Sequence, residues 1–312
     1  MKLFFRICAS VIIFFLAELS NAQVNGNQSL GVNYASNANL TSTDIKSDFY
    51  SRLDSKWYSE INTYPIFFGF SWLNYSKEIS NNVLSFTLSA EKVDSHLVAG
   101  QFSWIPRLFH RNYINSNAAT SDNSFTHTGA GLDLEKTWTT NSWLNITVEA
   151  GYEVRSFASF ANRADHEIHL MMDTDTHLET NLNLTTSAAF GFVISSLSEY
   201  SKNYFDLAAG LGGVYTPKLS WNSELRISSV SYPNRKISQV TEITNRRGKT
   251  SFQGADSNEK TFLTSARIGL AYLLDEAWVV KSGLSIASQN SNNEINSYKN
   301  NEIFLSVVFK GP

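Results

Sequence analysis

The sequence is poor in cysteine, proline and charge, and it has no long hydrophobic run. Its single cysteine, Cys8, lies in an N-terminal segment with the features of a signal peptide, so the exported part would contain none. Disulfide bonds and thiolate metal sites are therefore excluded from the exported part. Only 17% of the residues are charged, and the formal net charge of -3 is too small to indicate a nucleic-acid-binding protein.

The N-terminal segment is expected to direct export. Lys2 and Arg6 precede an apolar run from Ile7 to Leu19, and the small residues Ser20 and Ala22 follow at the positions that signal peptidase prefers. The run is shorter than the roughly 17 to 25 residues that a spanning helix needs. We therefore predict a signal peptide over residues 1–22, cleaved near Ala22, with the mature protein beginning near Gln23.

Residues 23–312 are expected to form one domain, because no Pro/Ser-rich linker or change in composition divides them. Apolar and polar residues alternate along fourteen segments, the pattern of β-strands with two different faces. The predicted strands of the first half are Ser29–Ser36, Asp48–Tyr58, Pro65–Tyr75, Val83–Lys92, Ser95–Trp104, Thr126–Thr137 and Trp143–Ser156. Those of the second half are Asp165–Thr176, Glu179–Ser195, Lys202–Tyr215, Lys218–Pro233, Lys260–Tyr272, Ala277–Ser288 and Asn301–Lys310.

The connections between these segments alternate between short and long. The expected short ones include Val93-Asp94, His177-Leu178 and Thr216-Pro217, whereas the long ones include Ile105–Ser124, Asn234–Glu259 and Gln289–Asn300. Outer-membrane barrels have short periplasmic turns, long outer loops and an even number of strands. The sequence therefore predicts an all-β fold: a transmembrane antiparallel up-and-down β-barrel of about 14 strands, within a range of 12 to 16. A soluble β-sandwich is the alternative, since its strands alternate similarly.

Aromatic residues support the membrane interpretation, because Trp and Tyr favour the two headgroup regions of a bilayer. Many lie at the predicted periplasmic turns, namely Trp57, Tyr58, Tyr64, Trp138, Trp143, Tyr215, Tyr272 and Trp278. We therefore expect the protein to reside in a bacterial outer membrane. Its expected contacts are membrane lipid, lipopolysaccharide and, during biogenesis, the barrel-assembly machinery.

Two short patches resemble known families. Tyr34–Leu40, with Ser47–Tyr50 leading the next strand, looks like the start of many outer-membrane barrels. Ser288–Asn292, followed by Tyr298–Glu302 and the closing strand, is similar to the C-terminal barrel of surface lipoprotein assembly modifiers and related porin-like barrels. The resemblance implies about fourteen strands and a location in the outer membrane.

Strand parity predicts which charged residues line the lumen. The acidic candidates are Glu91, Asp133, Glu135, Glu149, Glu153, Glu167, Asp173, Asp175, Asp206 and Glu224, and the basic ones are Arg52, Lys56, Arg155, Arg226, Arg267 and Lys281. Acids concentrate on the sixth to eighth predicted strands and bases on the eleventh to thirteenth, which predicts a field across the lumen. Because rings of charge set ion selectivity, we predict a porin-like channel for small polar or ionic solutes that weakly prefers cations.

Two other functions remain open at this stage. The lumenal charges could pair with one another and close the barrel, leaving long outer loops to bind a partner or lipopolysaccharide. An outer-membrane hydrolase is the third possibility, although no serine lies in a Gly-x-Ser-x-Gly motif. We therefore expect no enzymatic activity and no cofactor.

The densest group of chemically capable side chains surrounds His166-Glu167-Ile168-His169. On a strand His166 and His169 point to opposite faces, so they cannot share a metal ion. His169 and His177 would lie roughly 26 Å apart along the strand. We therefore expect His169 to form a lumenal hydrogen bond with Glu167 or Asp173, rather than a metal or acid-base site.

Overall fold

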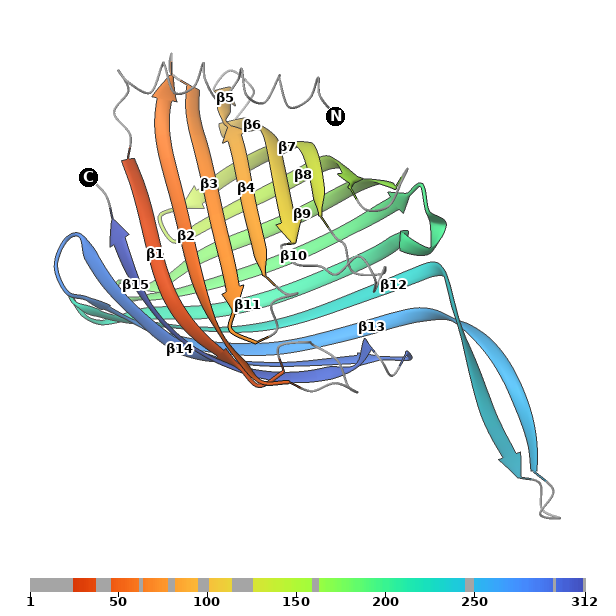
Figure 1. Ribbon diagram of the computed structural model, residues 1–312. Helices are drawn as coiled ribbons and strands as arrows, with labels where there is room; N and C mark the ends of the chain where they lie inside the picture. The colour runs from red at the N-terminus through yellow and green to blue at the C-terminus, as the bar shows by residue number, and fades with distance from the viewer. Residues whose placement is uncertain are drawn as a thin grey trace.

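The computed structural model describes residues 25–37, 46–61, 64–77, 82–94, 101–113, 126–158, 163–244, 250–293 and 296–310 (Figure 1). The first strands are β1 (Asn25–Ala35), β2 (Asp48–Ile61), β3 (Tyr64–Tyr75), β4 (Val83–Ala90), β5 (Lys92–Asp94), β6 (Gln101–Tyr113), β7 (His127–Asn141) and β8 (Leu144–Phe157). The others are β9 (Ala164–Glu179), β10 (Leu182–Ser195), β11 (Lys202–Thr216), β12 (Leu219–Thr244), β13 (Thr250–Leu273), β14 (Trp278–Ser291) and β15 (Tyr298–Lys310), with the short 3₁₀ helix η2 (Ser198–Tyr200) before β11. The predicted signal peptide and its cleavage site lie outside the described residues.

In the part of the chain that the structure describes, no helix has the length and apolar composition needed to cross a membrane.

The sheet closes on itself. Neighbouring strands pair antiparallel in chain order, and β1 pairs with β15 from Asn27↔Lys310 to Ala35↔Glu302. β4 and β5 both pair with β6 and are separated only at Glu91, so together they make one strand of the wall. The protein is therefore a closed antiparallel β-barrel of fourteen strands, as its sequence predicts (Figure 1).

The two faces of the wall differ as a lipid-facing barrel requires. On β9, Ile168, Leu170 and Met172 are exposed on the outer surface, whereas Glu167 and His169 alternate with them and turn inward. The same outward row of exposed apolar side chains recurs on β12 to β15. Such a surface suits hydrocarbon, because a closed barrel pairs its strands with one another and leaves no open edge.

The short connections gather at one end of the barrel, which we call the turn end. β7 and β8 are joined there at residues 142–143, β9 and β10 at 180–181, and β11 and β12 at 217–218. β1 begins and β15 ends at this same end, and the opposite end is called the loop end. The exposed rings of Trp143, Tyr215 and Trp278 lie at the turn end, where the sequence predicts an aromatic belt.

The sequence misplaces one strand. The predicted strand Ser95–Trp104 is replaced by β6, Gln101–Tyr113, so the first nine residues of the predicted loop Ile105–Ser124 belong to the wall. Pro106 suggests a loop because it cannot donate a ladder hydrogen bond. The structure nevertheless pairs Pro106 with Leu132 and turns Arg107 into the lumen.

The predicted loop Asn234–Glu259 is also wrong. β12 and β13 continue through it and pair with each other as far as Thr244↔Thr250. β12 pairs with β11 only up to Ser231, and β13 pairs with β14 only from Thr261. Residues 236–244 and 250–258 therefore form a two-stranded ribbon that projects beyond the wall at the loop end (Figure 1).

Candidate functional site

The candidate site is a wall of charged side chains that faces the lumen. Half of the residues predicted to line the lumen lie close together on β7, β8 and β9: Asp133, Glu135, Glu149, Glu153, Arg155, Glu167, Asp173 and Asp175. The others are spread around the barrel, with Arg52 and Lys56 on β2, Glu91 between β4 and β5, Asp206 on β11, Glu224 and Arg226 on β12, Arg267 on β13 and Lys281 on β14.

Arg107 connects the acidic wall to β6. Its Nη2 donates to Oδ1 of Asp133 at 3.0 Å, and its Nε lies 2.8 Å from the other carboxylate oxygen. The same Nη2 is 3.5 Å from Oε2 of Glu153. Because the Asp133 side chain is only 4% exposed, Arg107 compensates a charge that burial would otherwise make costly.

Arg155 forms the second bridge in the wall. It makes ion pairs with Glu153 on its own strand and with Glu167 on β9. The hydroxyl of Tyr204 on β11 donates to Oε1 of Glu167 at 2.6 Å. A continuous chain of charge-assisted contacts therefore runs from β6 to β11, and such contacts are stronger than neutral hydrogen bonds.

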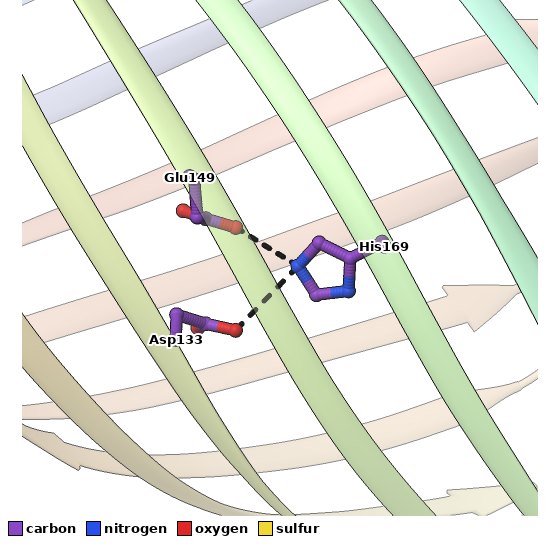
Figure 2. A group of neighbouring side chains, drawn as sticks. All are labelled: Asp133, Glu149 and His169. Atoms are coloured by element: carbon purple, nitrogen blue, oxygen red, sulfur yellow. Dashed lines mark hydrogen bonds and ion pairs between the residues drawn. The ribbon is translucent and has the colours of Figure 1, made fainter.

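His169 lies between two carboxylates of neighbouring strands (Figure 2). Its Nε2 is 3.0 Å from Oε1 of Glu149 on β8 and 3.5 Å from Oδ1 of Asp133 on β7. The expected hydrogen bond to Glu167 or Asp173 is wrong, because residues two or four apart on one strand are farther away than cross-strand neighbours. His166 faces outward, as its position predicts, and its Nδ1 is 2.6 Å from the hydroxyl of Tyr152.

Gly151 makes this arrangement possible. It stands in register between Asp133 and His169, and a Cβ added there would lie 2.2 Å from the imidazole and 2.4 Å from the Asp133 carboxylate. No side chain fits at such distances. The glycine therefore lets the imidazole and the carboxylate meet across β8.

A recess of about 320 Å³ opens next to this cluster, toward the turn end of β8 to β12. Three carboxylates line it, from Asp173, Asp175 and Glu224, together with the polar side chains of Asn145, Thr147, Thr185 and Ser187. Among the ion pairs of the described strands, none involves these three carboxylates. Oδ1 of Asp175 is buried without a hydrogen-bond partner.

Two bases of the far wall, Arg226 and Arg52, pair with neighbouring carboxylates. Nε of Arg226 donates to Oδ1 of Asp206 at 2.8 Å, and Arg52 pairs with Asp54 at 2.6 Å. The guanidinium of Arg267 lies 4.4 Å from the ring centre of Phe304. With Arg107 and Arg155 inside the acidic wall, the predicted separation of acids and bases is weaker than the sequence indicates.

Sequence reasoning missed two members of the wall. Arg107 falls in the predicted loop Ile105–Ser124, and Tyr204 is an uncharged aromatic residue, which has no distinctive signal in the sequence. A test of the inward parity of β6 would have found Arg107. Tyr204 depends on Gly191, its register partner, where a Cβ would lie 2.4 Å from the tyrosine ring.

Comparisons with known proteins do not assign the chain to a family. No protein-family model matches the chain, and no curated protein matches it either. The resemblance to surface lipoprotein assembly modifiers therefore stays a prediction.

Solved structures match most of the chain at very low sequence identity. A bacterial polysaccharide outer membrane secretin is 9% identical with a TM-score of 0.49, covering 92% of this chain and 98% of its own. An anion-selective porin from Comamonas acidovorans is 7% identical with a TM-score of 0.47, covering 93% and 99%. OmpT, an outer-membrane protein of Vibrio cholerae, is 7% identical with a TM-score of 0.45, covering 92% and 97%.

Proposed function

We propose that this barrel is a passive diffusion channel of a bacterial outer membrane, which passes small polar or ionic solutes and weakly prefers cations. The observation that carries the proposal is the recess of Asp173, Asp175 and Glu224 on a polar lumenal wall. Fixed charges on the wall of a water-filled pore attract ions of opposite sign. The proposal includes no catalytic step.

The expected preference is small. In water, a carboxylate about 5 Å from a monovalent cation attracts it by about 0.8 kcal/mol before salt screening. Three carboxylates that form no ion pair would therefore change the ratio of cation to anion permeability by a few fold. The paired charges of Arg155 with Glu167 and Arg226 with Asp206 contribute little, because each pair is nearly neutral at a distance.

A second candidate function is a closed barrel that acts through its outer surface. Two observations favour it: the lumenal charges of β6 to β11 pair with one another, and the ribbon of residues 236–244 and 250–258 extends beyond the wall. Barrels of about fourteen strands fall between the filled eight-stranded and the open sixteen-stranded types. In this alternative no solute passes, and the ribbon would contact a partner or lipopolysaccharide.

The test is the conductance of refolded residues 23–312 in a planar bilayer under a salt gradient. We expect discrete conductance steps and a reversal potential that indicates cation preference. The triple variant Asp173→Asn, Asp175→Asn, Glu224→Gln should keep conducting, with the permeability ratio moved toward unity by a few fold. Glu276→Gln, in the exposed turn between β13 and β14, is the matched control and should leave the ratio unchanged.

The outcomes separate the two candidates. A folded, heat-modifiable protein that never conducts would contradict the channel and favour the surface function. If the triple variant conducts with unchanged ion selectivity, the channel function stands, but the carboxylates of the recess do not determine its selectivity.

A further inference from the structure

The cluster of Asp133, Glu149 and His169 has a composition and spacing that a channel wall does not require. Each residue offers one ligand atom, and these atoms all lie within 4.8 Å of one another. The ligands come from three adjacent strands, β7, β8 and β9, and all three side chains are largely buried in the wall (Figure 2). In the described residues this is the one group of at least three His, Cys, Asp or Glu side chains with such spacing.

The separations are close to those found around a metal ion. Zinc binds imidazole nitrogen and carboxylate oxygen at about 2.0 to 2.2 Å, so two ligands of one tetrahedral ion are about 3.3 to 3.5 Å apart. Nε2 of His169 lies 3.0 Å from the Glu149 oxygen and 3.5 Å from the Asp133 oxygen. The two carboxylate oxygens lie within 4.8 Å of each other, so an ion would draw the side chains of Asp133 and Glu149 closer together.

Two neighbouring features hold the ligands in this arrangement. Gly151 provides the space in which the imidazole approaches Asp133. Arg107 contacts the Asp133 carboxylate from the other side, and each carboxylate oxygen retains a further lone pair for a second partner. Such outer contacts orient the ligands of metal sites and reduce the rearrangement that binding requires.

We propose that Asp133, Glu149 and His169 form a lumenal binding site for a divalent transition-metal ion of the zinc class. One imidazole nitrogen and two carboxylate oxygens suit Zn²⁺ and Co²⁺, and a water molecule would complete a tetrahedral shell. Ca²⁺ and Mg²⁺ fit less well, since they prefer oxygen ligands alone. The site does not depend on the proposed channel, because an ion can bind the wall of an open or a closed barrel.

The test is metal binding to the refolded mature protein, residues 23–312, in detergent. Titration with Co²⁺, followed by visible absorption, reports the coordination number, and calorimetry with Zn²⁺ gives the stoichiometry. We expect one ion per chain and an absorption spectrum typical of Co²⁺ with a low coordination number. Ca²⁺ in large excess should not displace the ion.

Two ligand variants and one matched control locate the site. His169→Gln and Glu149→Gln should each weaken Zn²⁺ binding by at least about tenfold, because loss of an outer contact alone costs about 10- to 100-fold. His177→Gln should bind as tightly as the parent protein, because His177 is exposed at the turn end with Nδ1 2.7 Å from Asn183. Heat-modifiability in gels shows whether each variant is folded.

Binding that is absent at millimolar Zn²⁺, or that is equally tight in both folded ligand variants, would overturn the proposal. The three side chains would then form only a hydrogen-bonded group. Conductance without metal binding would refute this site and support the channel. Metal binding by a barrel that does not conduct would support this site and contradict the channel.

Discussion

At the scale of single residues, glycines that face the lumen leave the space in which larger side chains of neighbouring strands contact each other. Gly151 lies between β7 and β9, and it lets His169 contact a carboxylate on the far side of β8. The sequence predicts the inward direction of His169. It could not supply the partners Glu149 and Asp133, because cross-strand neighbours depend on the register of three strands.

Gly151→Ala should destabilise the barrel. The new Cβ would lie 2.2 Å from the His169 ring, and forcing such a group into a packed site costs about 1 to 3 kcal/mol. Urea unfolding in lipid vesicles measures the loss. Gly69→Ala is the matched control, because its Cβ would meet Thr87 at an ordinary 3.7 Å. Equal stability of both variants would contradict the close packing at Gly151.

At the scale of elements, β12 and β13 serve two structural roles. Their turn-end portions belong to the wall, and residues 236–244 and 250–258 leave it as a ribbon. The base of the ribbon is fixed to the loop end, where Nε of Arg235 donates to the backbone oxygen of Glu199 in η2 at 3.3 Å. The sequence predicts a loop here because the ribbon lacks the apolar row that marks the membrane-spanning strands. A ribbon outside the bilayer needs no such row.

Shortening the ribbon should leave the barrel intact. Replacing residues 238–256 by Asn-Gly joins the register partners Ile237 and Ser257 through a two-residue turn. Because the described residues of the removed segment, 238–244 and 250–256, pair only with one another, we expect a change in free energy of unfolding below about 1 kcal/mol. Heat-modifiability and urea unfolding provide the measurement. A shortened chain that fails to close would show that the ribbon contributes to the wall.

At the scale of the whole molecule, the apolar outer surface makes the stability of the barrel depend on the surrounding bilayer. The sequence alone predicts this surface, the single domain and the fourteen strands, since strict alternation on strands such as β8 and β9 leaves little choice of facing. It does not predict β6, where Pro106 interrupts the pattern, or the pairing of charges across the lumen. Both require the strand register, which alternation alone does not provide.

A charge on the outer surface should be costly only at mid-depth. Leu170→Arg, near the middle of β9, should lower the free energy of unfolding by about 2 to 4 kcal/mol in lipid vesicles. Leu274→Arg, in the turn between β13 and β14, should cost about 0 to 1 kcal/mol. Both leucines are exposed to a similar degree, so the difference between the two variants reports the effect of depth in the membrane. Equal costs would argue against a membrane-embedded wall.

The pairing of β1 with β15 also has a consequence for biogenesis. Residues 27–35 can complete their ladder only when residues 302–310 have been delivered, after nearly all of the intervening chain. Contacts between such distant segments slow folding, and until they form the nascent sheet has two unpaired edges. Hydrocarbon cannot solvate such edges, so final insertion must await the last strand. A periplasmic protease or chaperone would therefore encounter an open sheet for most of the assembly time.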